Sequence, residues 1–169
     1  VLISSIAVLA DSRGVYEDSP AQDTESLPAY GKNRLQLERW VREDFPDALI
    51  VRLPALYGAG IRKNFLFDLH TITPAMLRPD KYSELAAKSV LVQSADVKLL
   101  HLCTPPVSAA EVYTAVTGKT DWHNELPKPP FDYDLRSRHA ALLGGSGDYL
   151  CTKQQELDDI TRFMRDWRD

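Results

Sequence analysis

Cysteine is scarce in this sequence, and its spacing excludes the usual cysteine-based sites. Cys103 and Cys151 are the two cysteines among 169 residues, and no Cys-x-x-Cys pair occurs. Zinc ribbons and disulfide frameworks both need closely and regularly spaced cysteines. The sequence therefore suggests neither kind of scaffold, and a reducing cytoplasm is the expected location.

Long apolar runs and an excess of positive charge are also missing. No apolar run approaches the roughly 20 residues of a membrane-spanning helix. The first residues have no basic leader and no small-residue cleavage pattern, which predicts a buried strand and not a signal peptide. The chain has 20 Lys and Arg against 24 Asp and Glu, a formal net charge of −4. This balance argues against binding to nucleic acid or to an anionic membrane, so a small-molecule ligand is expected.

The remaining sequence reads as an ordinary globular protein, with 44% hydrophobic and 26% charged residues. Alternating strand and helix patterns predict one α/β domain over residues 1–169. A polar loop is expected over 11–26 and an irregular, proline-rich stretch over 121–149. We expect strands at 1–8, 48–53 and 97–103, and helices at 28–44, 64–71, 80–90, 108–117 and 152–167. The last two helices should begin with capping boxes, Ser108 with Glu111 and Thr152 with Gln155. The expected apolar positions are Leu35, Leu37, Trp40 and Val41 in the helix at 28–44, and Leu157, Ile160, Met164 and Trp167 on one stripe of the last helix.

Two side chains of the helix expected at 28–44 are placed to act together. Tyr30 and Arg34 are positions i and i+4, which a helix brings onto one face with Cβ atoms roughly 5–6 Å apart. Ser5 ends the first apolar stretch, 25 residues before Tyr30. A free tyrosine has a pKa of about 10, and a fixed positive charge lowers that pKa toward the range of a general acid or base. The trio therefore predicts a proton-transfer site.

Four segments resemble, in order, parts of the extended short-chain dehydrogenase/reductase family, the NAD-dependent epimerase/dehydratase group that acts mostly on nucleotide sugars. The resemblance is dense over residues 1–64 and covers what looks like the second half of such an enzyme. It implies the later strands of a Rossmann-like parallel sheet, followed by a small mixed C-terminal substrate lobe. The matching segments are the strand at Val1–Val8, the acidic pair Glu17-Asp18, the helix start at Tyr30–Arg34, and the strand and turn at Val51–Gly60.

The resemblance implies a chemistry and a set of contacts. Tyr30 would be the general acid/base at a substrate hydroxyl or carbonyl, and Ser5 would hydrogen-bond the same oxygen. Arg34 would hold the phenolate and the cofactor ribose. NAD or NADP would be the cofactor, and the residues near its nicotinamide would include Tyr30, Arg34, Pro54, Ala55, Leu56 and Tyr57.

Substrate contacts and a dimer are also implied by the resemblance. Lys63 and Asn64 stand where relatives contact substrate, although a simple helix start would explain them as well. Arg136 could bind a substrate diphosphate through charge-assisted bonds; a solvated charged turn is the alternative. Relatives pair through the helix that carries the tyrosine, which implies a homodimer.

Three departures from the family pattern support a rival interpretation. Arg34 replaces the family's lysine, and the two side chains are not interchangeable. Ala55 stands where sugar epimerases often have asparagine. No Gly-x-x-Gly-x-x-Gly turn precedes Ser5, so the pyrophosphate-binding half and the residue that selects NAD or NADP are missing. The rival is a non-catalytic binding or regulatory protein that keeps a degenerate form of this fold.

Overall fold

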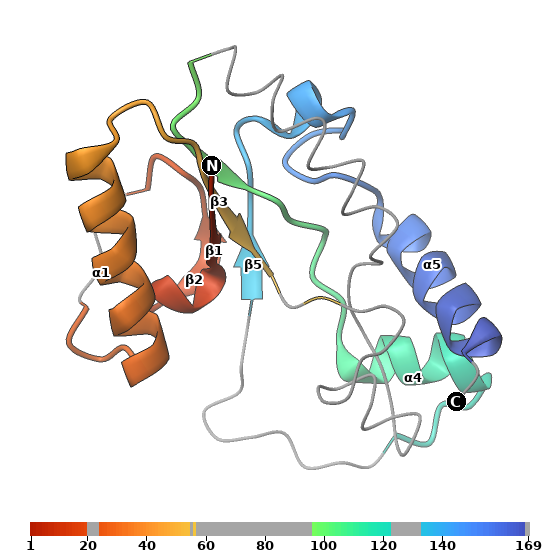
Figure 1. Ribbon diagram of the computed structural model, residues 1–169. Helices are drawn as coiled ribbons and strands as arrows, with labels where there is room; N and C mark the ends of the chain where they lie inside the picture. The colour runs from red at the N-terminus through yellow and green to blue at the C-terminus, as the bar shows by residue number, and fades with distance from the viewer. Residues whose placement is uncertain (20–23, 55, 57–95, 123–132, 168–169) are drawn as a thin grey trace.

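The computed structural model describes residues 1–19, 24–54, 56, 96–122 and 133–167 (Figure 1). In these ranges it contains two small parallel sheets and three α-helices, so the protein is of the α/β class, as the sequence predicted. The helices predicted at 64–71 and 80–90 lie outside the described residues. The elements are β1 (Leu2–Ser5), η1 (Ile6–Val8), β2 (Ser12–Val15), α1 (Ala29–Asp44), β3 (Ile50–Leu53), β4 (Leu99–His101), α4 (Ala109–Thr117), β5 (Tyr133–Leu135), η2 (Ala140–Leu143) and α5 (Lys153–Asp166).

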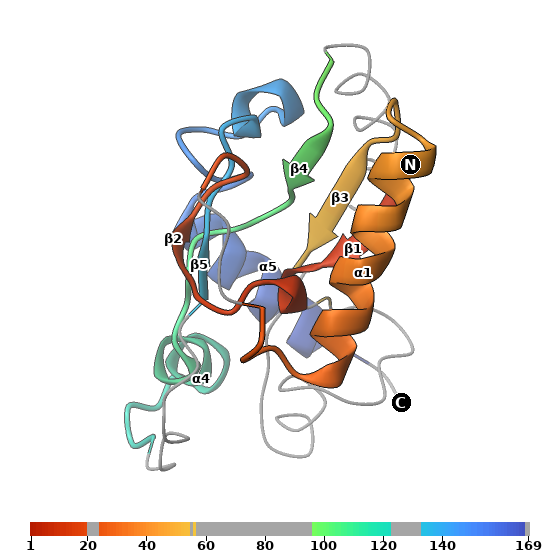
Figure 2. The same cartoon turned by 90° about the vertical axis from the view of Figure 1, so that its left-hand side faces the viewer.

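The first sheet has the strand order β1-β3-β4, and all its pairings are parallel. Its register places Ser5 beside Leu53, the last residue of β3. Helix α1 covers one side of this sheet, and α4 and α5 lie on the other side (Figures 1 and 2). A cluster of buried aliphatic side chains lies around β3 and contains Leu49, Val51, Leu53, Val97, Leu100, Leu102 and Leu143.

The first strand is shorter than the sequence predicted. It was expected over residues 1–8, but it ends at Ser5, and residues Ile6–Val8 form a 3-10 turn. The Ser5 side chain caps this turn, because its Oγ accepts a hydrogen bond from the Ala7 backbone nitrogen at 3.2 Å. Such local side-chain bonds compete with strand pairing, and here they direct the chain away from the sheet directly after Ser5.

The second sheet was not predicted. Strand β2 lies within the expected loop at 11–26, and its parallel partner β5 lies within the stretch at 121–149 that was expected to be irregular. Gly14 has a φ of 65°, and the register shifts between Arg13 and Val15. A bulged pair of short strands far apart in sequence leaves little periodic signal.

The helix predicted at 28–44 is confirmed by α1, but one residue expected at an apolar, buried position is exposed. It starts after Pro28, its N-cap residue, and Phe45 is its C-cap residue. Val41 is buried, as an apolar helix position should be. Trp40 was expected on the same apolar face but is 52% exposed, with its ring edge-on to that of Phe45. The buried face of α1 instead contains Gly31 and Glu38, which hydrophobic periodicity cannot reveal.

Two predicted capping boxes are confirmed at the helices of the C-terminal part. Ser108 and Glu111 cap α4, and Thr152 and Gln155 cap α5. The two helices pack together through a core centred on Val112 and Ile160. The apolar stripe predicted on the last helix, Leu157, Ile160, Met164 and Trp167, belongs to this core.

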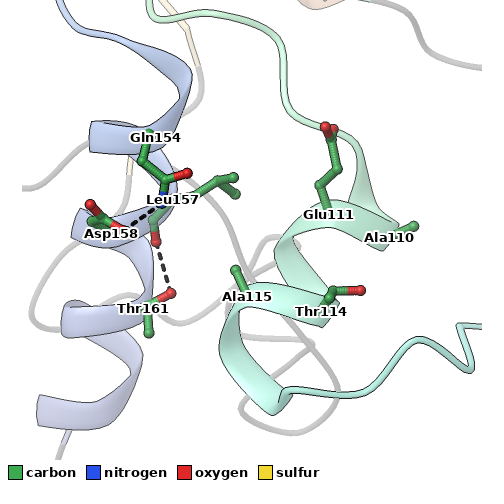
Figure 3. Close-up of a pocket in the computed structure, with 8 residues that line it drawn as sticks. All are labelled: Ala110, Glu111, Thr114, Ala115, Gln154, Leu157, Asp158 and Thr161. Carbon is green, nitrogen blue, oxygen red and sulfur yellow. Dashed lines mark hydrogen bonds between the residues drawn. The ribbon is translucent and has the colours of Figure 1, made fainter.

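A cavity of about 550 Å³ lies beside the α4–α5 contact (Figure 3). Leu157 points toward α4 across it, while Gln154 and Thr161 make hydrogen bonds within α5. All of its lining residues come from these two helices, so the cavity is separate from the trio of Ser5, Tyr30 and Arg34.

None of the helices in the described ranges is both long and apolar enough to cross a membrane.

Gly31 allows α1 to approach η1 closely. A Cβ built on Gly31 would lie 2.1 Å from the backbone oxygen of Ala7, and no side chain can relieve that contact. We therefore expect Gly31→Ala to lower the free energy of unfolding by about 1–3 kcal/mol, the usual penalty for overpacking. Helix propensity alone predicts the opposite sign, a gain of about 1 kcal/mol.

Urea unfolding of Gly31→Ala beside Asn33→Ala tests this expectation. Asn33 is an exposed residue of the same helix, so its replacement by alanine should leave stability unchanged or slightly higher. A Gly31→Ala protein as stable as Asn33→Ala would show that the close approach of α1 to η1 does not exist.

Candidate active site

The structure brings Tyr30 and Arg34 into direct contact on the first turns of α1. The Arg34 Nε donates a long hydrogen bond to the Tyr30 phenol oxygen at 3.4 Å. The guanidinium carbon lies 5.8 Å from the centre of the Tyr30 ring. A second nitrogen of Arg34, Nη1, donates to the Ile3 backbone oxygen at 3.5 Å. Arg34 therefore links the phenol to the edge of β1.

Ser5 is the last residue of β1, at its carboxyl end, and the η1 turn that follows it lies against Gly31 of α1. Its Oγ accepts from the Ala7 nitrogen, and a hydroxyl that accepts one bond can still donate its proton to another atom. The Ser5 side chain is close enough to Tyr30 for its hydrogen bonding to influence the phenol. The three side chains predicted from sequence are thus neighbours in space.

The surroundings of Tyr30 lower the pKa of its phenol below the ordinary value of 10.0. The hydrogen bond from Arg34 is the main cause, and its positive charge acts in the same direction. Partial burial opposes the shift, and a hydrogen bond with Ser5 adds to it. The side chain of Tyr30 is 56% exposed, so a substrate oxygen could reach it. This combination of access and lowered pKa suits a general acid or base.

The loop after β3 is described only in part. Pro54 is half-buried and Leu56 is 41% exposed at the same carboxyl edge of the sheet as Ser5. In open α/β sheets, ligands bind beyond this edge. Four other predicted contact residues, Ala55, Tyr57, Lys63 and Asn64, lie outside the described residues.

Arg136 lies in a separate cluster of charges near the second sheet. Its guanidinium makes a two-pronged contact with Asp134, at 2.7 and 3.1 Å. It also lies 5.9 Å from the centre of the Tyr16 ring and 3.8 Å from Asp148. A substrate phosphate would have to compete with these carboxylates for Arg136, so its predicted role as a diphosphate ligand remains a prediction.

The acidic pair after the first strand has a structural role. The Glu17 carboxylate accepts hydrogen bonds from the His101 nitrogen at 2.8 Å, from Ser137 Oγ at 2.6 Å and from the Arg138 nitrogen at 2.9 Å. Asp18 pairs with Arg138 at 3.3 Å. Glu17 therefore connects β4 to the segment after β5.

A buried ion pair behind the site was missed by the sequence interpretation. Glu38 of α1 has no exposed surface, and Arg52 of β3 is 8% exposed. Two nitrogens of Arg52 donate to the two carboxylate oxygens of Glu38, at 3.0 and 2.7 Å. Burial acts to raise the pKa of Glu38, but the hydrogen bonds and charge of Arg52 outweigh it and hold that pKa below its ordinary value. One hint was present in the sequence, because the charged Arg52 stands within the strand predicted at 48–53.

His101 completes this buried group and has a defined protonation state. Its Nδ1 lies 2.9 Å from the Arg136 backbone oxygen, which can only accept, so Nδ1 carries a proton. Its Nε2 lies 3.5 Å from Arg52 Nη1 and faces a donor. Burial lowers the pKa of His101, against the opposing charge of Glu17. Both ring nitrogens of His101 therefore face protein groups, and the lowered pKa favours its neutral form.

Metal binding finds no support in the described part of the chain. No group of three or more His, Cys, Asp or Glu side chains gathers there in a way that could hold an ion. Cys103 and Cys151 are not joined in a disulfide, and burial is the main cause of a raised pKa at Cys103.

Comparison with known proteins gives one partial similarity. A stretch of 99 residues, 58% of this chain, is 34% identical to the ceramide reductase of Caulobacter vibrioides strain NA1000 / CB15N. The chain spans about a third of that relative, since the match covers 31% of its length. The chain matches no protein-family profile and no solved structure.

Proposed function

We propose that this chain is part of an NAD(P)-dependent oxidoreductase of the extended short-chain dehydrogenase type, with Tyr30 as its general acid/base. The observation that supports the proposal best is the contact between the Tyr30 phenol and Arg34, beside Ser5 and at the carboxyl end of a parallel strand. A partly exposed tyrosine with a lowered pKa has little structural purpose at that edge. A proton donor, by contrast, needs access to the substrate, a lowered pKa and a place at the ligand-binding edge of the sheet.

The residues have separate tasks in this mechanism. Ser5 donates its hydroxyl proton as a hydrogen bond to the substrate oxygen and orients it toward the phenol. During reduction of a carbonyl, Tyr30 gives its proton to that oxygen, and in the reverse direction it removes the proton from a hydroxyl. Arg34 stabilises the phenolate that forms, because its positive charge lies next to the phenol oxygen. The bound nicotinamide would supply or accept the hydride.

Some of the described residues would meet one end of such a cofactor. Arg34 offers nitrogen donors to a ribose, and Pro54 and Leu56 lie at the edge where the nicotinamide would rest. The sequence contains no Gly-x-x-Gly-x-x-Gly turn, so a pyrophosphate site of that kind would come from outside these 169 residues. NAD and NADP are both compatible with the proposal.

Two substrate classes deserve testing. The family resemblance favours a nucleotide sugar, but Ala55 removes the polar contact that sugar epimerases often have. The partial similarity to a ceramide reductase favours reduction over epimerisation and adds ceramide as a second candidate. A cytoplasmic homodimer that acts on a small molecule remains part of the proposal.

A non-catalytic binding protein is the second candidate, and Arg34 favours it. A guanidinium is larger and flatter than the family's ammonium group and cannot take its place without a change in geometry. In that case the fold would bind a ligand without transferring a hydride.

Cofactor binding and turnover separate the two candidates. We expect the full-length protein to bind NADH or NADPH in a fluorescence titration and to oxidise it in the presence of a ketone derivative of ceramide or of a nucleotide sugar. The 169-residue chain alone should bind more weakly, because it lacks the glycine-rich turn. If the full-length protein binds neither dinucleotide, the oxidoreductase proposal is wrong and the second candidate is favoured.

A further inference from the structure

The helix that carries the proposed catalytic pair also carries a fully buried charge. Tyr30, Arg34 and Glu38 follow one another at intervals of four residues along α1, so they lie near one face, with a drift of about 40° per interval. Glu38 is about 12 Å along the axis from Tyr30, at about 1.5 Å per residue. One end of this face is 56% exposed at Tyr30, and the other has no exposure at Glu38.

Glu38 is anchored to the middle of the first sheet. Its partner Arg52 belongs to β3, where it pairs in register with Ser4 of β1 and His101 of β4. The contact uses both carboxylate oxygens and two guanidinium nitrogens. A two-pronged contact of this kind fixes direction as well as distance. Arg52 also faces the neutral His101, which limits how it can turn.

The stability of the fold does not explain why this pair is buried. Taking two charges out of water is expensive, and apolar side chains of similar volume often serve a core equally well or better. The pair does, however, define one position of α1 on the sheet. A slip of α1 by one helical turn, about 5.4 Å, would break this two-pronged contact and leave the Glu38 and Arg52 charges buried apart from each other.

A second fixed point lies at the other end of this face. Gly31 lies so close to Ala7 that a Cβ would come within 2.1 Å of a backbone oxygen. Contacts at residues 31 and 38 therefore hold α1 on both sides of Arg34. Ala7 follows the strand that ends in Ser5, and Arg52 pairs with that strand in the sheet. Both contacts therefore fix the position of α1 relative to Ser5.

We propose that Glu38 and Arg52 are positioning residues, whose buried ion pair fixes the register of α1 on the sheet and so holds the Tyr30 phenol beside Ser5. The inference deepens the proposed function and rests on it, because the position of Tyr30 matters to a reaction only if Tyr30 is the proton donor. Neither residue needs to touch a substrate or a cofactor. They affect the reaction by fixing the position of Tyr30.

The double variant Glu38→Leu/Arg52→Met in the full-length protein tests this inference. It removes one negative and one positive charge, so the net charge is unchanged and a change at Tyr30 reports geometry. The readout is the pKa of the Tyr30 phenol, measured by NMR of ¹³Cζ-labelled tyrosine and assigned with Tyr30→Phe. We expect that pKa to rise by the contribution of the lost Ser5 hydrogen bond, because Arg34 lies on α1 and moves together with Tyr30. We also expect kcat to fall by about 10- to 100-fold, as a displacement near 1 Å can cause, with an unfolding midpoint close to the parent's.

The matched control is Glu25→Gln/Lys32→Gln. It removes an ion pair of 3.7 Å from the start of the same helix, where both side chains are substantially exposed, again without a change in net charge. Lys32 is much nearer to Tyr30 in sequence than Glu38 is. The control should nevertheless leave the Tyr30 pKa and kcat unchanged.

Arg52→Lys decides the question if the double variant does not fold. Lysine keeps the charge but not the two-pronged contact, so a smaller rise in the Tyr30 pKa is expected. An unchanged Tyr30 pKa and kcat in a folded double variant, or in Arg52→Lys when the double variant is unfolded, would overturn the inference. Full turnover by Tyr30→Phe would instead overturn the proposed function, and the NMR titration would still test the register.

Discussion

Replacing Tyr30 with phenylalanine in the full-length protein lowers kcat by about 10²- to 10⁴-fold, the usual contribution of a positioned acid or base. The variant loses only the phenol oxygen, which accepts the Arg34 hydrogen bond. More than half of the side chain is exposed, so the fold depends little on that oxygen. The affinity for NADH or NADPH should therefore stay close to that of the parent, and a fluorescence titration measures it.

Tyr113→Phe is the matched control for this substitution. Tyr113 lies on α4, and its hydroxyl donates to the exposed Asp121 at 3.0 Å. Its loss should change neither kcat nor cofactor binding. Turnover by Tyr30→Phe at the level of Tyr113→Phe would exclude Tyr30 as the proton donor.

Removing Arg52 produces the largest expected loss of stability. Arg52→Met leaves Glu38 buried beside the half-exposed Arg42, which lies at 3.8 Å. Breaking a buried ion pair from one side costs about 3–5 kcal/mol, because the other charge is left without compensation. Urea unfolding of Arg52→Met, Glu38→Leu and the double variant measures the coupling free energy between the two side chains. The double variant should recover most of the loss.

An exposed ion pair supplies the comparison. Lys98 pairs with Asp47 at 3.0 Å, and both side chains are well exposed. Lys98→Met should change the free energy of unfolding by no more than about 1 kcal/mol. If Arg52→Met is as mild as Lys98→Met, the Glu38–Arg52 contact is not the buried ion pair described above.

Local signals in the sequence predicted the helices better than the sheets. The capping boxes at Ser108 and Thr152 are complete within four residues, and both helices begin where those residues indicate. Strand β2 depends on β5, more than 100 residues later in the sequence. Pairing between strands so far apart in the sequence is set by tertiary packing, so no local sequence pattern predicts it.

The candidate site divides in the same way. The interval between Tyr30 and Arg34 is a helical spacing, and the structure turns it into a contact. The buried partners of Glu38 could not be predicted, because a glutamate on a helix is usually solvated and only the fold brings Arg52 to it. Local spacing in the sequence therefore predicted the contact between Tyr30 and Arg34, but not the buried residues that hold α1 on the sheet.

The claim at the centre of this account is that Arg34 tunes the Tyr30 phenol for proton transfer. NMR titration of ¹³Cζ-labelled tyrosine in the parent and in Arg34→Gln measures that effect directly, with Tyr30→Phe for assignment. The account predicts a Tyr30 pKa below 10.0 in the parent and a higher pKa in Arg34→Gln. A Tyr30 pKa at the ordinary value in both proteins would contradict it.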